Sequence, residues 1–195
     1  QRRVLKGAAG AAGLEARGRG TPVGRMRVPA VPAAALFDLF VGDPTARPDA
    51  AMGAAALADA RVGTPVEGRV GAASAATVGK ILGVERAGWG GIGVASVHLD
   101  DGLVVSALAV VNAFGNVLDP ESGVFVAGPR GDSGAIVDTE AMILAGALSR
   151  FASSPSNTTI GVVVTNGSLD RERCVRASWM AAQALPMCLR PSWSA

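Results

Sequence analysis

The chain has 195 residues, of which 49% are hydrophobic, 17% charged and 4% aromatic, with no tyrosine. This length suffices for one domain with a sizeable core, and the composition excludes an intrinsically disordered chain. Basic residues gather within the first 27 positions without interleaved aromatic residues, and the formal net charge is only +2, so we expect no nucleic-acid partner.

The residues that usually bind metals are scarce. His98 is the only histidine, and Cys174 and Cys188 are the only cysteines, without CxxC spacing. A catalytic zinc site with several histidine ligands is therefore excluded, and we expect neither a metal nor a cofactor. Two isolated cysteines fit a reducing compartment, which predicts a cytoplasmic protein. The longest apolar run, residues 103–111, is too short to cross a bilayer, so no membrane partner is expected.

The N-terminal third predicts two helices. Residues 2–16 have apolar residues at helical spacing. Asp49 is a suitable N-cap for a second helix through residues 51–58. The chain begins at Gln1 rather than at a methionine, which predicts that it starts inside a longer protein.

The middle of the chain predicts a β-hairpin. Residues 63–79 are rich in glycine and alanine and end at Lys80. Two apolar strands follow, over residues 94–99 and 103–112, and the turn Asp100–Gly102 joins them.

The C-terminal third predicts further helices. A polar segment over residues 115–138 leads to Thr139, which is expected to cap a helix over residues 140–151. An amphipathic helix is expected over residues 169–184, with one apolar face made by Val175, Trp179 and Ala182. Because helices both precede and follow strands, the pattern indicates a layered α/β (α+β) protein.

Residues 153–166 take a polar, proline-containing loop directly into a β-branched apolar run. Thr158 therefore lies where a loop becomes a strand, so that its hydroxyl is held by a rigid element yet stays reachable. The Asn157–Thr158 bond is a candidate for self-cleavage, in which the hydroxyl attacks the Asn157 carbonyl and the resulting ester hydrolyses. The freed α-amine, with a reference pKa of about 7.7 to 8.0, could then serve as base for the hydroxyl. A chance N-x-T sequence at a strand-entry turn is the plainer interpretation.

Four motifs occur in chain order: VPAAALFDL at 31–39 with GDP at 42–44, ATVGK at 76–80, AVVNA at 109–113 and NTTIGVVVTN at 157–166. Together they resemble the DmpA-type family of L-aminopeptidase D-Ala-esterase/amidases, β-aminopeptidases and nylon-oligomer hydrolases. The resemblance runs from about residue 14 to Met180. It implies a self-processing hydrolase of the N-terminal-nucleophile type with a four-layer αββα sandwich, incomplete in this chain.

The resemblance also implies roles for individual residues. Thr158 would be the nucleophile, with self-cleavage between Asn157 and Thr158. Lys80 would lie beside it, where a cation lowers the pKa of an amine and stabilises an oxyanion. Asn112 would be an oxyanion-hole donor, and Phe37 would line the substrate pocket. Plainer interpretations are a solvent-facing Lys80, an Asn112 that satisfies backbone groups at a strand end, and a Phe37 in the core.

At the level of the whole chain, the resemblance implies a single partial hydrolase domain. Residues 1–157 would belong to an α-subunit and residues 158–195 to the start of a β-subunit. The substrate would be a small peptide or an amino-acid amide, and the protein would be a homo-oligomer. The acidic Asp-Gly-Asp-type pair of the family would fall beyond Ala195, which predicts a fragment truncated at both ends. A non-catalytic remnant that serves as a structural subunit is therefore an alternative.

Two other motifs were weighed. The segment Gly131–Gly134, with sequence GDSG, resembles the nucleophile segment of chymotrypsin-like proteases, so a serine protease using Ser133 is a further alternative. That mechanism needs a histidine base, and His98 is the only candidate. Residues 88–93 match a Gly-x-Gly-x-x-Gly pattern but precede a strand instead of opening a helix, so dinucleotide binding is not expected.

Overall fold

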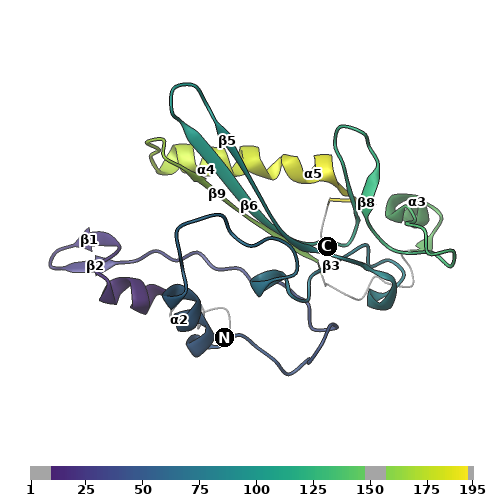
Figure 1. Ribbon diagram of the computed structural model, residues 1–195, viewed down its shortest axis with the longest axis horizontal. Helices are drawn as coiled ribbons and strands as arrows, with labels where there is room; N and C mark the ends of the chain where they lie inside the picture. The colour runs from purple at the N-terminus through teal and green to yellow at the C-terminus, as the bar shows by residue number, and fades with distance from the viewer. Residues whose placement is uncertain (1–9, 148–156, 193–195) are drawn as a thin grey trace. The chain divides into compact units, whose positions relative to one another are not determined.

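The computed structural model describes residues 10–147 and 157–192 (Figure 1). The chain divides into two compact units, one of residues 1–35 with 43–64 and one of residues 36–42 with 65–195. All the candidate site residues belong to the second unit.

The first unit contains both predicted helices. The described part of the first helix covers residues 10–16, while residues 2–9 lie outside the described residues. An unpredicted hairpin follows, in which β1 (Thr21–Val23) pairs with β2 (Met26–Val28). Helix α2 (Ala50–Ala58) confirms the second prediction. Its N-cap is Asp49, whose carboxylate accepts a hydrogen bond from the Met52 N–H at 2.9 Å.

The second unit is organised around a three-stranded antiparallel sheet in the order β5-β6-β9. Its strands are β5 (Gly91–His98), β6 (Val104–Asn112) and β9 (Thr158–Thr165), and β5 and β6 confirm the predicted hairpin. The register places Asn112, the last residue of the central strand, opposite Thr158, the first residue of β9. Pairing in the sheet thus brings two motifs that are far apart in the sequence to the same end of the sheet.

The core beneath this sheet is made of aliphatic side chains, several of them small. One buried cluster joins Val110 to Ala73 and Ala76. A second joins Val78, Ala113 and Leu189. Small residues allow the backbone segments to approach closely, so that packing is tight around the end of β6.

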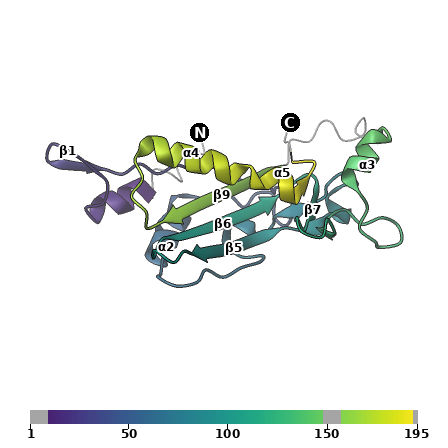
Figure 2. The same cartoon turned by 90° about the horizontal axis from the view of Figure 1, so that it is seen from above.

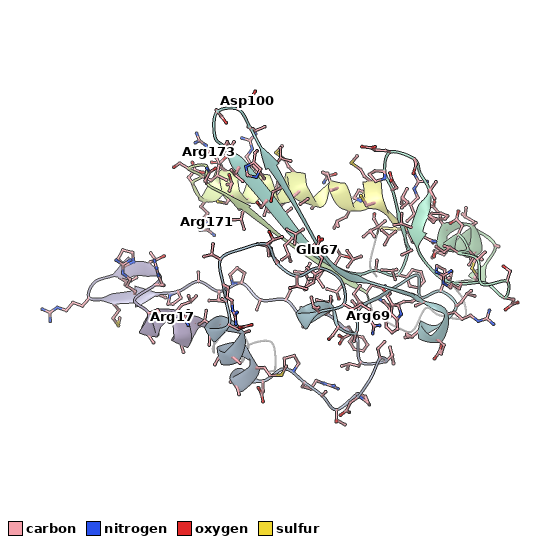
Figure 3. The ribbon with its side chains drawn as sticks, in the orientation of Figure 1. Arg17, Glu67, Arg69, Asp100, Arg171 and Arg173 are labelled. Atoms are coloured by element: carbon pink, nitrogen blue, oxygen red, sulfur yellow. The ribbon has the colours of Figure 1, made fainter. Side chains whose placement is uncertain are left out.

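The loop that carries Glu67 and Arg69 lies along the edge of β5 that is not paired with β6. The Glu67 carboxylate accepts a hydrogen bond from the Val94 N–H at 2.6 Å. The Arg69 guanidinium carbon lies 3.3 Å from the centre of the Trp89 ring. Glu67 and Arg69 are labelled in Figure 3. The Glu67 contact occupies a main-chain N–H at the edge of β5 that could otherwise pair with another strand.

Short elements that the sequence analysis did not predict surround the sheet. Strands of two or three residues are too short to show a periodicity in the sequence. The polar segment 115–138 therefore gave no signal for the two short strands within it. The short strands form a sheet in the order β10-β7-β8 and a two-stranded sheet of β3 and β4. The strands are β3 (Thr77–Val78), β4 (Gly88–Trp89), β7 (Asn116–Leu118), β8 (Phe125–Ala127) and β10 (Leu189–Arg190), and the 3₁₀ helices are η1 (Gly71–Ala73) and η2 (Val84–Arg86).

The prediction that Thr139 caps the next helix is wrong by one residue. Helix α3 spans Thr139–Leu144, and its N-cap is Asp138, whose carboxylate accepts from the N–H groups of Glu140 at 2.8 Å and Ala141 at 3.2 Å. A carboxylate is favoured there because it also interacts with the helix dipole. The helix ends before Gly146, which has a φ of +88°, and residues 148–151 of the predicted helix lie outside the described residues.

We predict that Asp138→Ala lowers the free energy of unfolding by about 1 kcal/mol, because two helix N–H groups lose their acceptor. Urea denaturation of the purified protein measures this change. Asp138→Asn keeps a capping oxygen and is expected to retain most of the stability. Equal stability of the alanine variant and the wild type would contradict the assigned cap.

The last predicted helix is confirmed, but its apolar face is not buried. Helix α4 (Arg171–Ala182) begins after Asp170, which accepts from the Arg173 N–H at 2.8 Å, and α5 (Ala184–Cys188) continues it. Figure 2 shows the two helices in line beside β9. No residue of α4 is buried, and Trp179 is 70% exposed. The apolar face of α4 is therefore exposed among the described residues.

Together, the described residues form a mixed α/β structure with small antiparallel sheets, which confirms the predicted class. Within these residues, none of the helices has the length and apolar character that a bilayer crossing requires.

Candidate active site

The proposed nucleophile lies at the predicted junction of loop and strand. Thr158 is the first residue of β9 and is partly buried. Its hydroxyl donates a hydrogen bond to the carbonyl oxygen of Asn157 at 2.6 Å. The hydroxyl thus contacts the carbonyl group whose carbon atom it would attack in self-cleavage.

The same junction holds an unsatisfied polar group. Among the described residues, the side-chain oxygen of Asn157 is buried and has no hydrogen-bond partner. A buried acceptor without a partner costs roughly 1 to 3 kcal/mol. The uncleaved junction therefore contains a locally unfavourable group immediately before Thr158.

Asn112 connects three segments of the site. Its side chain is fully buried, and its Oδ1 accepts from the Thr77 N–H at 3.0 Å. Its Nδ2 donates to the carbonyl oxygen of Phe37 at 2.8 Å. Both bonds satisfy backbone groups, as the plainer interpretation of a strand-end amide expects. The oxyanion role of Asn112 stays a prediction.

Lys80 enters this site because of the backbone that precedes it. Gly79 has a φ of +72°, and a Cβ atom there would collide with Pro129. The Lys80 N–H then bonds to the Phe114 carbonyl at 2.9 Å. The side chain is only 6% exposed, and its Nζ donates to the main-chain carbonyl of Asn112 at 2.9 Å. The interpretation of Lys80 as a solvent-facing residue is therefore wrong.

Burial also changes the acid–base chemistry of Lys80. Removal from water disfavours the ammonium form and lowers the pKa of the amine from 10.5 to about 7, whereas the charge of Asp38 acts in the opposite direction. Near neutral pH both the ammonium and the neutral amine are then populated. A buried group with so strongly shifted a pKa is a candidate for an active-site residue.

Phe37 contacts the candidate site through its main-chain carbonyl, which accepts the hydrogen bond from Asn112. Its side chain is half-buried, and its ring meets that of Phe40 edge to face with 5.6 Å between the centroids. A pocket of about 100 Å³ lies next to Thr158, and Phe37 does not line it. The pocket lining is mixed polar and apolar and consists of Ala113, Phe114, Asn157, Thr158, Thr159, Leu185, Leu189, Pro191 and Ser192. Sequence reasoning missed Leu185 and Leu189, because no motif marks residues that α5 and β10 bring close to the junction.

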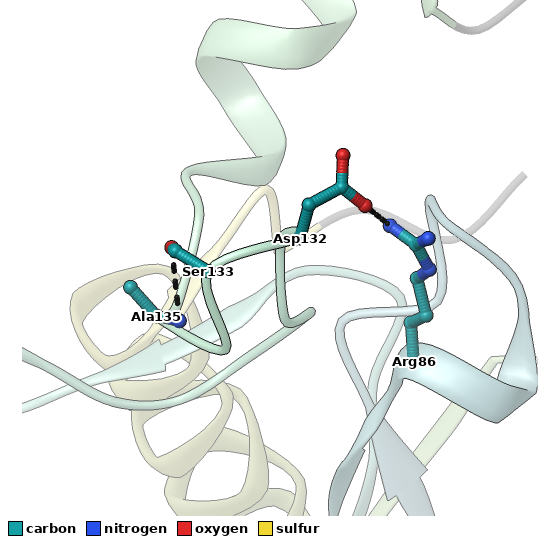
Figure 4. Close-up of polar contacts among 4 residues, drawn as sticks. All are labelled: Arg86, Asp132, Ser133 and Ala135. Atoms are coloured by element: carbon teal, nitrogen blue, oxygen red, sulfur yellow. Dashed lines mark hydrogen bonds and ion pairs between the residues drawn. The ribbon is translucent and has the colours of Figure 1, made fainter.

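The GDSG segment does not form a serine-protease triad. The Asp132 carboxylate pairs with Arg86 at 2.6 Å, and the Ser133 hydroxyl accepts from the Ala135 N–H at 3.4 Å (Figure 4). Within the described part of the chain, neither Asp132 nor Ser133 has a hydrogen bond to His98. These contacts are those of a surface turn.

The described residues also bear on metal binding. Across residues 10–147 and 157–192, no cluster of three or more histidine, cysteine, aspartate or glutamate side chains has a suitable arrangement.

Curated relatives resemble this chain over most of its length. An uncharacterized aminopeptidase of Mycobacterium bovis is 37% identical over 186 residues, which are 92% of this chain and 51% of that protein. An uncharacterized aminopeptidase of Mycobacterium leprae is 37% identical over 185 residues, which are 93% of this chain and 51% of that protein. The chain thus spans about half the length of these curated relatives.

Both relatives are named as peptide-cleaving enzymes of one class, the aminopeptidases. The sequence model of peptidase family S58 matches residues 6–194, so the chain belongs to peptidase family S58. This confirms the resemblance to the DmpA-type family that the four motifs predicted.

Proposed function

We propose that the chain is part of a self-processing aminopeptidase or amidase of the N-terminal-nucleophile type, with Thr158 as nucleophile. The observation that carries the proposal is the contact between the Thr158 hydroxyl and the Asn157 carbonyl at 2.6 Å. Asn112, which lies opposite Thr158 in the sheet, accepts a hydrogen bond from the buried amine of Lys80. Membership of a peptidase family and the aminopeptidase names of two relatives support the reaction class.

Self-cleavage would begin with attack of the Thr158 hydroxyl oxygen on the Asn157 carbonyl carbon. The C–N bond breaks, the hydroxyl proton passes to the departing nitrogen, and an ester joins Asn157 to the Thr158 side chain. Water then hydrolyses the ester, which leaves a carboxylate on Asn157 and a free α-amine and hydroxyl on Thr158. Cleavage would also release the buried side-chain oxygen of Asn157, which has no hydrogen-bond partner among the described residues.

In the cleaved protein, the Thr158 α-amine would take the proton of the adjacent hydroxyl as it attacks a substrate amide. The leaving amine receives that proton, and water releases the acyl group in a second step. The Lys80 ammonium and the Asn112 amide would stabilise the negative charge on the substrate oxygen. Phe37 would position the substrate, which is a small peptide or an amino-acid amide.

The same proposal includes the assembly of the protein. Residues 1–157 and 158–195 would be parts of two subunits that stay together after cleavage, within one hydrolase domain. The sheet and helices of the second unit would belong to a four-layer αββα sandwich, and the protein would form a homo-oligomer. These features are those that the resemblance of the four motifs implies.

Hydrolysis of amino-acid p-nitroanilides tests the reaction. Thr158→Ala removes the nucleophile and is expected to lower kcat/KM by at least about a thousandfold. Ser133→Ala is the matched control and should keep the wild-type rate, because Ser133 lies in a surface turn. Full activity of Thr158→Ala would overturn the mechanism. Absence of hydrolysis by the wild type would favour the non-catalytic subunit instead, and loss of activity in Ser133→Ala would favour the serine protease.

A further inference from the structure

A small pocket lies beside the Asn157–Thr158 junction. It has a volume of about 100 Å³, and its lining joins the junction to Leu185 of α5 and Leu189 of β10. Phe114, which follows β6, lines the same pocket, and its carbonyl accepts a hydrogen bond from the Lys80 N–H at 2.9 Å. The pocket therefore shares its walls with the segments that carry the proposed nucleophile and hold the main chain of Lys80.

The wall formed by α5 and β10 is anchored to the core. Leu189 is 4% exposed and pairs with Val117 in the small sheet of β10, β7 and β8. Leu185 is half-buried and packs against the buried cluster that contains Leu189. Gly115 lies so close to β10 that a Cβ atom there would collide with the main chain of Arg190. Packing of this kind fixes the size of the pocket.

The size and the chemistry of the lining limit what the pocket can hold. An apolar cavity of about 150 Å³ holds a benzene molecule, so about 100 Å³ leaves room for a short aliphatic side chain but not for an aromatic one. None of the nine described residues of the lining carries a charged side chain. A charged group would lose water there without a countercharge from the lining, which is unfavourable. The pocket thus suits a short, uncharged side chain.

Asn157 links this pocket to the proposed chemistry. In self-cleavage it is the residue whose acyl group passes to the Thr158 hydroxyl, and it belongs to the pocket lining. The same hydroxyl would later attack the substrate, and a reacting carbonyl carbon must come within roughly 3 to 3.5 Å of it. The acyl residue of the substrate therefore has to reach the position that Asn157, itself short and uncharged, occupies before cleavage.

We propose that this pocket receives the side chain of the substrate residue whose carbonyl carbon Thr158 attacks, and that Leu185 sets the upper limit on its size. The inference rests on the proposed function and narrows its substrates to amides of residues with short, uncharged side chains. Leu185 determines specificity through the volume that it occupies, since an aliphatic side chain can take no part in proton transfer.

Hydrolysis of two p-nitroanilides tests the size limit. The wild type should have a higher kcat/KM for L-alanine p-nitroanilide than for L-phenylalanine p-nitroanilide. Leu185→Ala widens the pocket and is expected to raise the phenylalanine-to-alanine ratio of kcat/KM at least about tenfold. Leu185→Met keeps the bulk and should keep the ratio.

Leu108→Ala is the matched control, because Leu108 is also half-buried but packs against the other core cluster. It should leave the ratio unchanged even if it lowers stability. An unchanged ratio in Leu185→Ala, with hydrolysis that still depends on Thr158, would overturn the inference and leave the proposed function in place.

A binding measurement separates the inference from the proposed function, because it needs no turnover. Isobutyramide and phenylacetamide serve as probes, and nuclear magnetic resonance follows ¹³C-labelled leucine methyl groups. Isobutyramide should shift the signals of Leu185 and Leu189 in the wild type, and phenylacetamide should shift the Leu189 signal only in Leu185→Ala. Absence of the isobutyramide shift would overturn the inference. Isobutyramide binding in a protein whose hydrolysis does not depend on Thr158 would reject the proposed function and retain the pocket.

Discussion

Asn112→Ala is expected to reduce both the stability and the activity of the protein. The variant leaves the Thr77 N–H and the Phe37 carbonyl without their buried partner, at a cost of roughly 1 to 3 kcal/mol for each group. Loss of an oxyanion donor should also lower kcat by about a hundredfold to a thousandfold. Urea denaturation and p-nitroanilide kinetics measure the two effects separately.

Asn116 offers a matched control for this prediction. Its side chain is also fully buried, donates to the Val137 carbonyl at 2.8 Å and accepts from the Thr139 N–H at 2.8 Å. Asn116→Ala should therefore destabilise the fold to a similar extent while the folded protein keeps its kcat. If the two variants lose the same activity at the same folded fraction, Asn112 has only a structural role.

Lys80→Met is expected to remove a pH dependence of stability. The pKa of Lys80 is about 7 in the folded protein and 10.5 as a model value for the unfolded chain, so the unfolded state binds more protons between these values. Stability must then rise as the pH increases from about 7 towards 10, by an amount on the order of a few kcal/mol. Below pH 7 the full cost of the buried charge is present.

Methionine has similar bulk but no charge, so the variant should be more stable than the wild type near pH 6. The difference between the two proteins should shrink as the pH rises. Urea denaturation across this range measures the difference, which separates Lys80 from the other titrating groups. A constant difference from pH 6 to pH 10 would show that Lys80 does not titrate with a lowered pKa.

The sequence predicted the main elements of the site because local signals marked them. The turn Asp100–Gly102 and its apolar flanks predicted the hairpin, and the change from a polar loop to a β-branched run predicted the start of β9 at Thr158. The position of Asn112 opposite Thr158 follows from sheet pairing. No local pattern determines which strands pair, so the resemblance to a family was needed to bring these motifs together.

Other features depend on tertiary contacts that no local pattern shows. The buried Lys80 follows Gly79, whose backbone lies too close to Pro129 for any side chain at position 79. Thr139 and Asp138 are both good caps, and only the geometry of the preceding backbone selects Asp138. The exposed face of α4 is apolar in sequence, but hydrophobic spacing does not reveal what a helix packs against.

Mass spectrometry of the junction tests the central claim most directly. Protein purified at its native length should contain a polypeptide that begins at Thr158 and another that ends at Asn157. Thr158→Ala should remain a single uncleaved chain, and Thr158→Ser, which keeps a hydroxyl, should still be cleaved. A wild-type protein that hydrolyses amides while its Asn157–Thr158 bond stays intact would contradict the claim that Thr158 becomes an N-terminal nucleophile.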